Sequence, residues 1–428
     1  MLVDVDSTKT KNAWLAQWIA HLTSNQEVAG STPALAPENS EEISTNLLFA
    51  DFNQDYGCFS IGTDDGFKIF NSDPFKEKMS REFDEGGIGN VTMLYRSNFL
   101  ALVGGGRNPQ FPPNKVMLWD DSTRQIISEL EFRSDVRRVM LRKDMIIVLL
   151  RSKCIVCTLE PQPQKLHAFE TCDNIKGIGS ISTESESGIL VFPGRQKGQI
   201  QVVELNQLSS KSYFFSSSNQ DTNSNTRNSV SDSLENSEPL NQVLHPANIN
   251  IIVAHTSNLS ALSVSSDGTL IASASEKGTL IRVFSSPGGV LLYELRRGVD
   301  RANIYSLAFS TDATRLCVSS DKGTVHIFNL ELGGENQSTS MTHDNSGAVS
   351  TRGNRQSSLS FFKGILPKYF SSEWSFAHFR VQSEVRCICG FSPNRDYVIV
   401  ICANGVCEKY SIGALKGQCT REWTRRFI

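Results

Sequence analysis

SSDGTLIASASEKGTLIRVF, at residues 265–284, contains two short apolar strands joined by a turn that ends in glycine. The same phrase recurs as NQDYGCFSIGTDDGFKIF at 53–70, STDATRLCVSSDKGTVHIF at 310–328 and SPNRDYVIVICANGVCEKY at 392–410. Apolar runs of this length, joined by tight Gly, Asn or Asp turns, are typical of β-hairpins. The sequence therefore predicts a chain built from repeated hairpins.

Weaker hairpin phrases at 115–132, 135–160 and 177–205 bring the number of repeats to seven. The aromatic ends Phe284 and Phe328 lie 44 positions apart, within the roughly 40–45 residues of a propeller blade. We therefore expect an all-β fold, a seven-bladed β-propeller of the WD-repeat type with two long loop insertions. Arranging many short strands as blades in a closed ring leaves only short, protected sheet edges.

The blades account for residues 45–410, and the remaining segments differ in composition. Residues 1–44 match no blade and are expected to form a disordered tail, and residues 411–428 form a C-terminal segment. A first insertion, 206–247, has 11 Ser and 6 Asn in its first 35 positions, so we expect a flexible loop. A second insertion, 331–376, ends in the apolar run SSLSFFKGILPKYFSSEWSF.

Composition excludes several functions. The 42 Lys and Arg against 45 Asp and Glu give a net charge of −3, so no global basic field attracts nucleic acid. The 10 cysteines include two close pairs, Cys154/Cys157 and Cys387/Cys389, in apolar runs without zinc-ligand spacing. We expect buried thiols, no metal and a reducing, cytosolic compartment.

Motifs for catalysis or membrane crossing are not found in the sequence. The apolar stretch at 13–21 is about half the length that a bilayer requires, so no transmembrane span is expected. Neither a nucleophile elbow nor a phosphate-binding P-loop occurs. The sequence predicts no catalytic site, no enzyme activity and no cofactor.

The stretch VLLYELRRGVDRANIYSLAFS, at 290–310, is locally basic. Successive side chains on a strand point to opposite sides, so Arg296 and Arg297 are expected to serve two neighbouring pockets. The planar guanidinium fork suits phosphate. Hydroxyl and imidazole side chains surround the pair in sequence, yet these residues also knit propeller strands together, and adjacent arginines are often merely solvated. The residues alone leave both interpretations open.

The motif ELRRG at 294–298, preceded by ASASEKGTLIRVF and followed by a VHIF strand, resembles the PROPPIN family over about residues 45–410. These are seven-bladed propellers that bind phosphoinositides through a Phe-Arg-Arg-Gly motif, and SFFKGILPKYFSSEW looks like the sixth-blade loop of plant members. Leu295 stands where many members have Phe. Leu295 should face the blade interior, so we expect lipid binding to survive this difference.

The resemblance implies two phosphoinositide pockets, one on either side of the motif. The first would consist of His255, Ser273, Ser275, Gly278, Thr279, Arg282 and Arg296. The second would consist of Arg297, Gly298, Ser320, Thr324 and His326. The implied ligands are phosphatidylinositol 3-phosphate and phosphatidylinositol 3,5-bisphosphate.

The second insertion supplies a further expected membrane contact, because apolar insertion added to headgroup binding makes attachment stable. The candidates for insertion are Phe361, Phe362, Ile365, Leu366, Tyr369 and Phe370. The alternative is a segment that packs back on its own blade, and Pro367 argues against a long uninterrupted helix.

The resemblance also implies how such a protein acts. It would be a monomer in the cytosol that recruits autophagy proteins, among them an elongated lipid-transfer protein, during autophagosome formation. It would lie peripherally on the preautophagosomal structure and on endosomal or vacuolar membranes. The alternative is a protein-only WD-repeat scaffold or ubiquitin-ligase substrate receptor. A propeller hydrolase would need clustered acids or a metal, and the sequence shows no such cluster.

Overall fold

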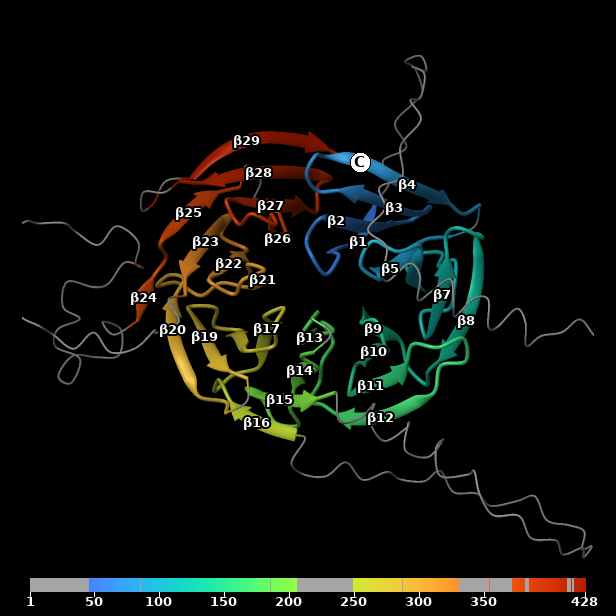
Figure 1. Ribbon diagram of the computed structural model, residues 1–428, viewed down its shortest axis with the longest axis horizontal. Helices are drawn as coiled ribbons and strands as arrows, with labels where there is room; N and C mark the ends of the chain where they lie inside the picture. The colour runs from blue at the N-terminus through green and yellow to red at the C-terminus, as the bar shows by residue number, and fades with distance from the viewer. Residues whose placement is uncertain are drawn as a thin grey trace, which may run out of the picture.

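The computed structural model describes residues 46–84, 86–184, 186–205, 249–286, 288–330, 354, 372–381, 385–413, 417 and 419–428. These residues form seven sheets arranged as blades around a central axis, as Figure 1 shows, and all but one of the pairings between the named strands are antiparallel. The described chain contains strands and no helix. The predicted seven-bladed β-propeller is therefore confirmed.

Each of the first four blades is a sheet of four consecutive strands. Blade 1 is β1 (Leu47–Phe52), β2 (Cys58–Thr63), β3 (Gly66–Asn71) and β4 (Lys76–Glu82). Blade 2 is β5 (Ile88–Met93), β6 (Phe99–Gly104), β7 (Lys115–Asp120) and β8 (Gln125–Glu131). Blade 3 is β9 (Val136–Leu141), β10 (Met145–Leu150), β11 (Lys153–Thr158) and β12 (Lys165–Glu170). Blade 4 is β13 (Ser180–Ile181), β14 (Ile189–Pro193), β15 (Gln199–Glu204) and β16 (Ile249–Val253).

Blades 5 and 6 are each completed by a strand from late in the chain, at 373–374 within the second insertion and at 377–380 directly after it, whereas blade 7 follows both. Blade 5 is β17 (Leu259–Val264), β18 (Leu270–Ser275), β19 (Leu280–Ser285) and β20 (Leu291–Arg296), extended by β24 (Glu373–Trp374). Blade 6 is β21 (Ile304–Phe309), β22 (Arg315–Ser320), β23 (Thr324–Asn329) and β25 (Ala377–Arg380). Blade 7 is β26 (Cys387–Phe391), β27 (Tyr397–Cys402), β28 (Val406–Ile412) and β29 (Cys419–Arg426). Residues 419–426, beyond the boundary expected at 410, thus form the outer strand of blade 7.

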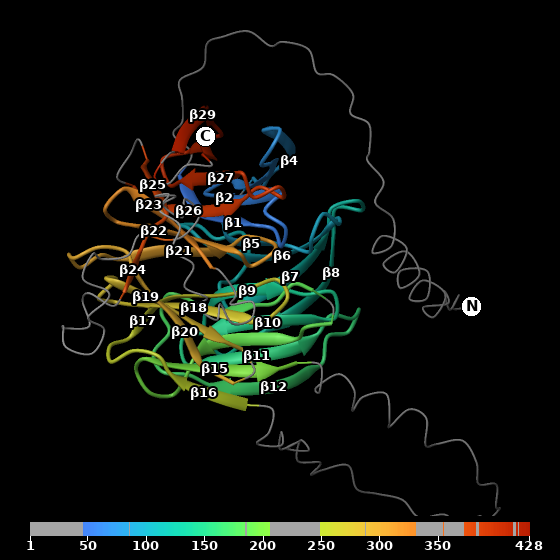
Figure 2. The same ribbon diagram turned by 60° about the vertical axis from the view of Figure 1, so that its left-hand side comes forward.

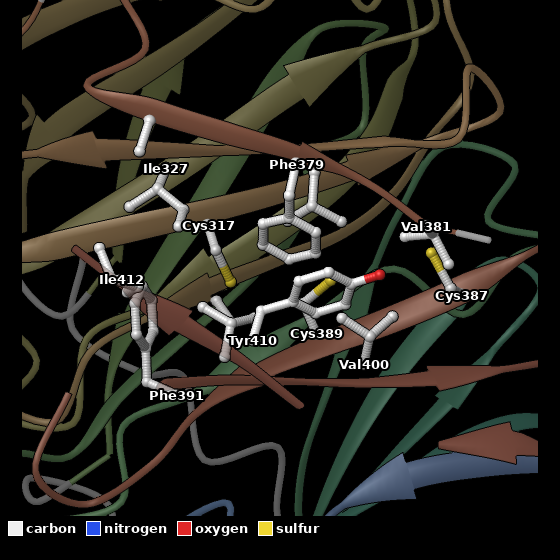
Figure 3. Packing of buried hydrophobic residues seen from close by; sticks show 14 of the residues in the cluster. Cys317, Ile327, Phe379, Val381, Cys387, Cys389, Phe391, Val400, Tyr410 and Ile412 are labelled. Carbon is white, nitrogen blue, oxygen red and sulfur yellow. The ribbon is translucent and has the colours of Figure 1, made fainter. Parts of the chain in front are cut away.

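Strand composition follows distance from the ring axis. The second strand of a blade is covered on both faces, so β10 reads MIIVLL and is buried throughout. The outer strand β4, in contrast, reads KEKMSRE, and none of its residues is fully buried. Clusters of buried side chains lie between neighbouring blades, and Figure 3 shows the one between blades 6 and 7. The core is therefore a series of layers between blades rather than one central mass.

The ring closes between the first and the last blade without a shared strand, because β1–β4 and β26–β29 form separate sheets. An apolar cluster joins them instead. Phe427 packs against Phe59 and Phe70, at ring-centroid distances of 5.5 and 5.8 Å. Phe75 meets Trp423 at 5.8 Å.

Candidate functional site

The arginine pair lies at the end of β20, the fourth strand of blade 5. Leu295, opposite Ile281 in the register, is fully buried in the layer between blades 5 and 6. Because side chains alternate along a strand, Arg296 points to the other face and Arg297 returns toward blade 6. Both arginines are largely buried, at 9% and 6% exposed. Leu295 thus anchors the motif in the core, as expected of the residue that replaces Phe.

The first group of polar residues follows one face of blade 5, where Ser273, Arg282 and Glu294 are aligned across three strands. The Nε2 atom of His255 lies 3.0 Å from Oγ of Ser273. Arg282 donates from Nε and Nη2 to Oε2 of Glu294, at 3.1 and 2.9 Å. Its Nη1 donates to the carbonyl of Ala254 at 2.6 Å. These bonds hold the guanidinium of Arg282 in one orientation.

Ser372 links this group to Arg296. Its hydroxyl donates to Oε1 of Glu294 at 3.3 Å and accepts from Nη2 of Arg296 at 3.5 Å. Glu294 thereby lies between the two arginines, and its carboxylate balances part of their positive charge. Neither Glu294 nor Ser372 was predicted to contribute to the site. The only signal in the sequence is that Glu294 and Arg296 lie two residues apart on one strand, which places their side chains on the same face of the blade.

The second group lies toward blade 6. Arg297 donates from Nε to the carbonyl of Gly278 at 3.1 Å and from Nη2 to the carbonyl of Asp300. Burial is the main cause that lowers the pKa of Arg297 from its usual value. Nδ1 of His326 lies 3.2 Å from Oγ of Ser375. The rings of His326 and His378 are stacked with their centroids 5.8 Å apart.

The remaining predicted residues shape the backbone around Arg297 or lie beside it. The amide of Arg297 donates to the carbonyl of Thr279, and the amide of Gly278 donates to the carbonyl of Ser275. Ser320 is buried and accepts from the Lys322 amide at 3.4 Å, whereas Thr324 is half-buried opposite Arg380. Gly298 has open space where a Cβ would lie.

Both histidines are uncharged at neutral pH. Burial, followed by the nearby Arg282, lowers the pKa of His255 to about 4. Burial and His378 lower the pKa of His326 to about 3. The two imidazoles therefore offer neutral hydrogen-bonding nitrogens, and the positive charge of each group resides on arginine.

A short strap crosses the rim between the two groups. β24 pairs in parallel with β20, with Leu295 opposite Glu373 and Arg296 opposite Trp374, and the chain then continues into β25 of blade 6. Figure 1 shows β24 between β20 and β25 at the edge of the ring, and Figure 2 shows the three strands from the side. Ser372 and Ser375, at the two ends of the strap, each contact one group.

The six apolar residues predicted to insert into membrane, Phe361, Phe362, Ile365, Leu366, Tyr369 and Phe370, lie outside the described residues. The structure does fix where that insertion leaves and rejoins the propeller, at Leu330 after β23 and at Ser372 before β24. Both points lie on the blade 5–6 side of the ring that carries the arginines. Among the described residues, no helix is long and apolar enough to span a membrane, and no cluster of potential metal ligands occurs there.

The fold and the site define a class of protein: a seven-bladed propeller whose rim carries two buried, oppositely directed arginines with neutral imidazoles and hydroxyls beside them. The chain belongs to the PROPPIN family, whose model matches residues 224–410. It is 35% identical over 388 residues to SVP1-like protein 2 of Pichia angusta, covering 89% of this chain and 95% of that protein. It is 32% identical over 368 residues to autophagy-related protein 18e of Arabidopsis thaliana, covering 85% and 83%.

Solved structures agree with the fold. Kluyveromyces lactis Hsv2 with a complete loop 6CD superposes with a TM-score of 0.64 at 23% identity, covering 90% of this chain and all of that one. A complex of KlAtg21 with the coiled-coil of AgAtg16 matches at a TM-score of 0.62 and 21% identity, with the same coverage. The sequence relatives confirm the predicted family, and the solved structures confirm its fold.

Proposed function

We propose that this protein is a non-enzymatic phosphoinositide effector in autophagy. It binds phosphatidylinositol 3-phosphate and phosphatidylinositol 3,5-bisphosphate at the two arginine groups and recruits other autophagy proteins to the membrane. The observation that carries the proposal is the arrangement of Arg296 and Arg297, which are buried on opposite faces of one rim strand. The group around each arginine contains a hydroxyl paired with a neutral imidazole, Ser273 with His255 and Ser375 with His326, which would complete a phosphate site.

The low net charge supports selectivity for phosphoinositides over other anionic lipids. A protein with a net charge of −3 has no global attraction to anionic membrane, so binding should depend on specific headgroup contacts. The second insertion would then add apolar contacts with the membrane beside the arginines, and the propeller would be oriented edge-on to the bilayer. The residues that would insert are Phe361, Phe362, Ile365, Leu366, Tyr369 and Phe370. The protein would be a monomer in the cytosol until it binds preautophagosomal, endosomal or vacuolar membrane.

A protein partner completes the proposal. An elongated autophagy lipid-transfer protein is the partner that family membership suggests. KlAtg21, a structural neighbour, is itself known in complex with the coiled-coil of AgAtg16, which supports protein recruitment as a capacity of this fold. A pulldown dominated by ligase or other scaffold subunits, independent of lipid, would favour the protein-only alternative.

The deciding experiment is liposome flotation with vesicles that differ only in phosphoinositide. The double variant Arg296→Ala/Arg297→Ala should lose more than about tenfold in binding, because charged hydrogen bonds contribute about 1.5–3 kcal/mol each. Arg425→Ala/Arg426→Ala is the matched control, since it removes another adjacent arginine pair at the end of an outer strand, β29 in blade 7. Unchanged binding by the first variant, with the fold intact, would refute the proposal.

A further inference from the structure

Four cysteines from three strands gather between blades 6 and 7. Cys317 lies on β22, Cys387 and Cys389 on β26, and Cys402 on β27, and all four belong to the same buried cluster. Figure 3 shows the sulfur atoms of Cys317, Cys387 and Cys389 in this layer. The thiols of Cys389 and Cys402 lie close enough to that of Cys387 to influence its pKa. The proposed lipid sites do not involve these groups.

Cys387 and Cys402 face each other directly across two neighbouring strands. At the next position, the amide of Ala403 donates to the carbonyl of Arg386 at 2.8 Å. Hydrogen-bonded and non-hydrogen-bonded pairs alternate along an antiparallel ladder, so the cysteines form a non-hydrogen-bonded pair, with Cα atoms about 4.5 Å apart and close side chains. That separation lies within the range that disulfides span.

The same pair borders the central cavity of the ring. Cys387, Cys389 and Cys402 line this cavity, which has a volume of about 810 Å³ and also contacts Arg386. Cys387 and Cys402 are only 2% and 1% exposed, so a small oxidant would reach them from this cavity through local opening of β26 and β27. Hydrogen bonds from Cys389 and then Cys402 lower the pKa of Cys387, in opposition to burial, whereas the pKa of Cys389 is raised. Cys387 is thus the thiol best suited to react first, because the thiolate is the nucleophile.

We propose that Cys387 and Cys402 are a peroxide-sensitive modification site that closes to a reversible cross-strand disulfide. The Cys387 thiolate attacks one oxygen of hydrogen peroxide, which gives a sulfenic acid and releases hydroxide that takes up the thiol proton as water. The Cys402 sulfur then attacks the sulfenic sulfur. The S–O bond breaks, the S–S bond forms and a second water leaves, so that one peroxide oxidises two thiols. A cellular dithiol reverses the step by thiol–disulfide exchange.

Trypsin separates the two cysteines, which allows a direct test on the full-length protein. Cleavage after Arg386, Arg395 and Lys409 yields peptides 387–395 and 396–409. Reduced protein is exposed to hydrogen peroxide, its remaining thiols are alkylated under denaturing conditions, and the digest is analysed by mass spectrometry. We expect the two peptides to be joined, at the summed mass of the two peptides with Cys389 and Cys407 alkylated, less two hydrogen atoms, and to separate after treatment with dithiothreitol.

Two of the controls lie within the same two peptides. Cys389→Ser and Cys407→Ser each remove the other cysteine of one peptide, and both should keep the link. Cys402→Ser and Cys387→Ser should each abolish it. A link that persists in Cys402→Ser, or complete alkylation of both peptides in peroxide-treated wild type, would overturn the proposal. Fragmentation of the joined wild-type peptides identifies the bonded residues even if a serine variant fails to fold.

Discussion

Two glycines beside Arg297 have different physical requirements. Gly278 has a φ of +61°, and a Cβ at this position would lie 1.8 Å from the carbonyl oxygen of Ala302. Gly298 has no atom within 4 Å of its Cβ position. Because the carbonyl of Gly278 also accepts from Arg297, its conformation sets the place of that guanidinium.

We predict that Gly278→Ala destabilises the protein by about 2 kcal/mol or more, since it combines a left-handed backbone with a steric clash. Gly298→Ala should change stability by less than about 0.5 kcal/mol. Urea unfolding of the two variants measures the difference. Equal stability losses would show that the local backbone relaxes without cost and that the cradle of Arg297 is not fixed by Gly278.

His255 gives the stability a dependence on pH. Its folded pKa of about 4 lies below the usual value of 6.5, so the unfolded chain binds more protons between these values. The stability associated with neutral His255 is fully present above about pH 6.5 and is lost as the pH falls toward 4. The loss is on the order of 3 kcal/mol at about 1.4 kcal/mol per pKa unit.

Urea unfolding of the wild type and His255→Asn at several pH values tests this dependence. We expect the wild type to lose more stability than the variant between pH 7 and pH 4.5, because asparagine cannot take up the proton. Carboxylates and the other histidines titrate in both proteins, so the difference between the two curves of stability against pH isolates the contribution of His255. Parallel curves would contradict a buried neutral imidazole at this position.

At the scale of the element, the strap β24 ties the second insertion to both arginine groups. Ser372 contacts Glu294 and Arg296, and Ser375 contacts His326. Each serine fixes a polar side chain whose orientation a headgroup would require. In the proposed sites, which consist mainly of residues from blades 5 and 6, the strap would therefore act as a positioning element.

We predict that Ser372→Ala/Ser375→Ala lowers the affinity of each proposed site for a soluble inositol phosphate headgroup about three- to tenfold, because each site loses one serine contact worth about 1 kcal/mol. Calorimetric titration measures the affinity without any contribution from membrane insertion. Ser411→Ala is the control, since it removes a serine hydrogen bond at 3.2 Å to the Thr420 carbonyl in blade 7. An unchanged affinity in the double variant would exclude a positioning role for the strap.

The strap also shows where prediction from the sequence ends. Hairpin repeats are local patterns, so they predicted the blade count, and strand alternation predicted that Arg296 and Arg297 diverge. The contact between Glu294 and Ser372 spans 78 positions and depends on the path of an insertion that follows no repeat. A local repeat pattern does not predict which residues so far apart in the sequence come into contact. The strand β24 has only two residues and is too short to show a pattern of its own.

At the scale of the whole molecule, the ring depends on a joint that no strand crosses. Blades 1 and 7 meet through Phe59, Phe70 and Phe427. Around the rest of the ring the chain itself links each blade to the next, whereas blades 1 and 7 are held together by side chains alone, namely these aromatic contacts and the ion pair between Lys409 and Asp73 at 2.6 Å. We therefore expect this joint to open before the other blade interfaces.

Phe427→Ala should therefore destabilise the protein by about 3 kcal/mol or more, the usual cost of a large cavity in a core, and should loosen the ring at one place. Native-state hydrogen exchange should show faster exchange in β2, β3, β28 and β29 than in blades 3 and 4. Phe192→Ala is the control, because Phe192 is also a buried phenylalanine, here in the layer between blades 3 and 4. That variant should lose similar stability but keep the protection of β2 and β29. If both variants accelerate exchange evenly around the ring, the propeller opens as one cooperative unit and the joint between blades 1 and 7 has no special weakness.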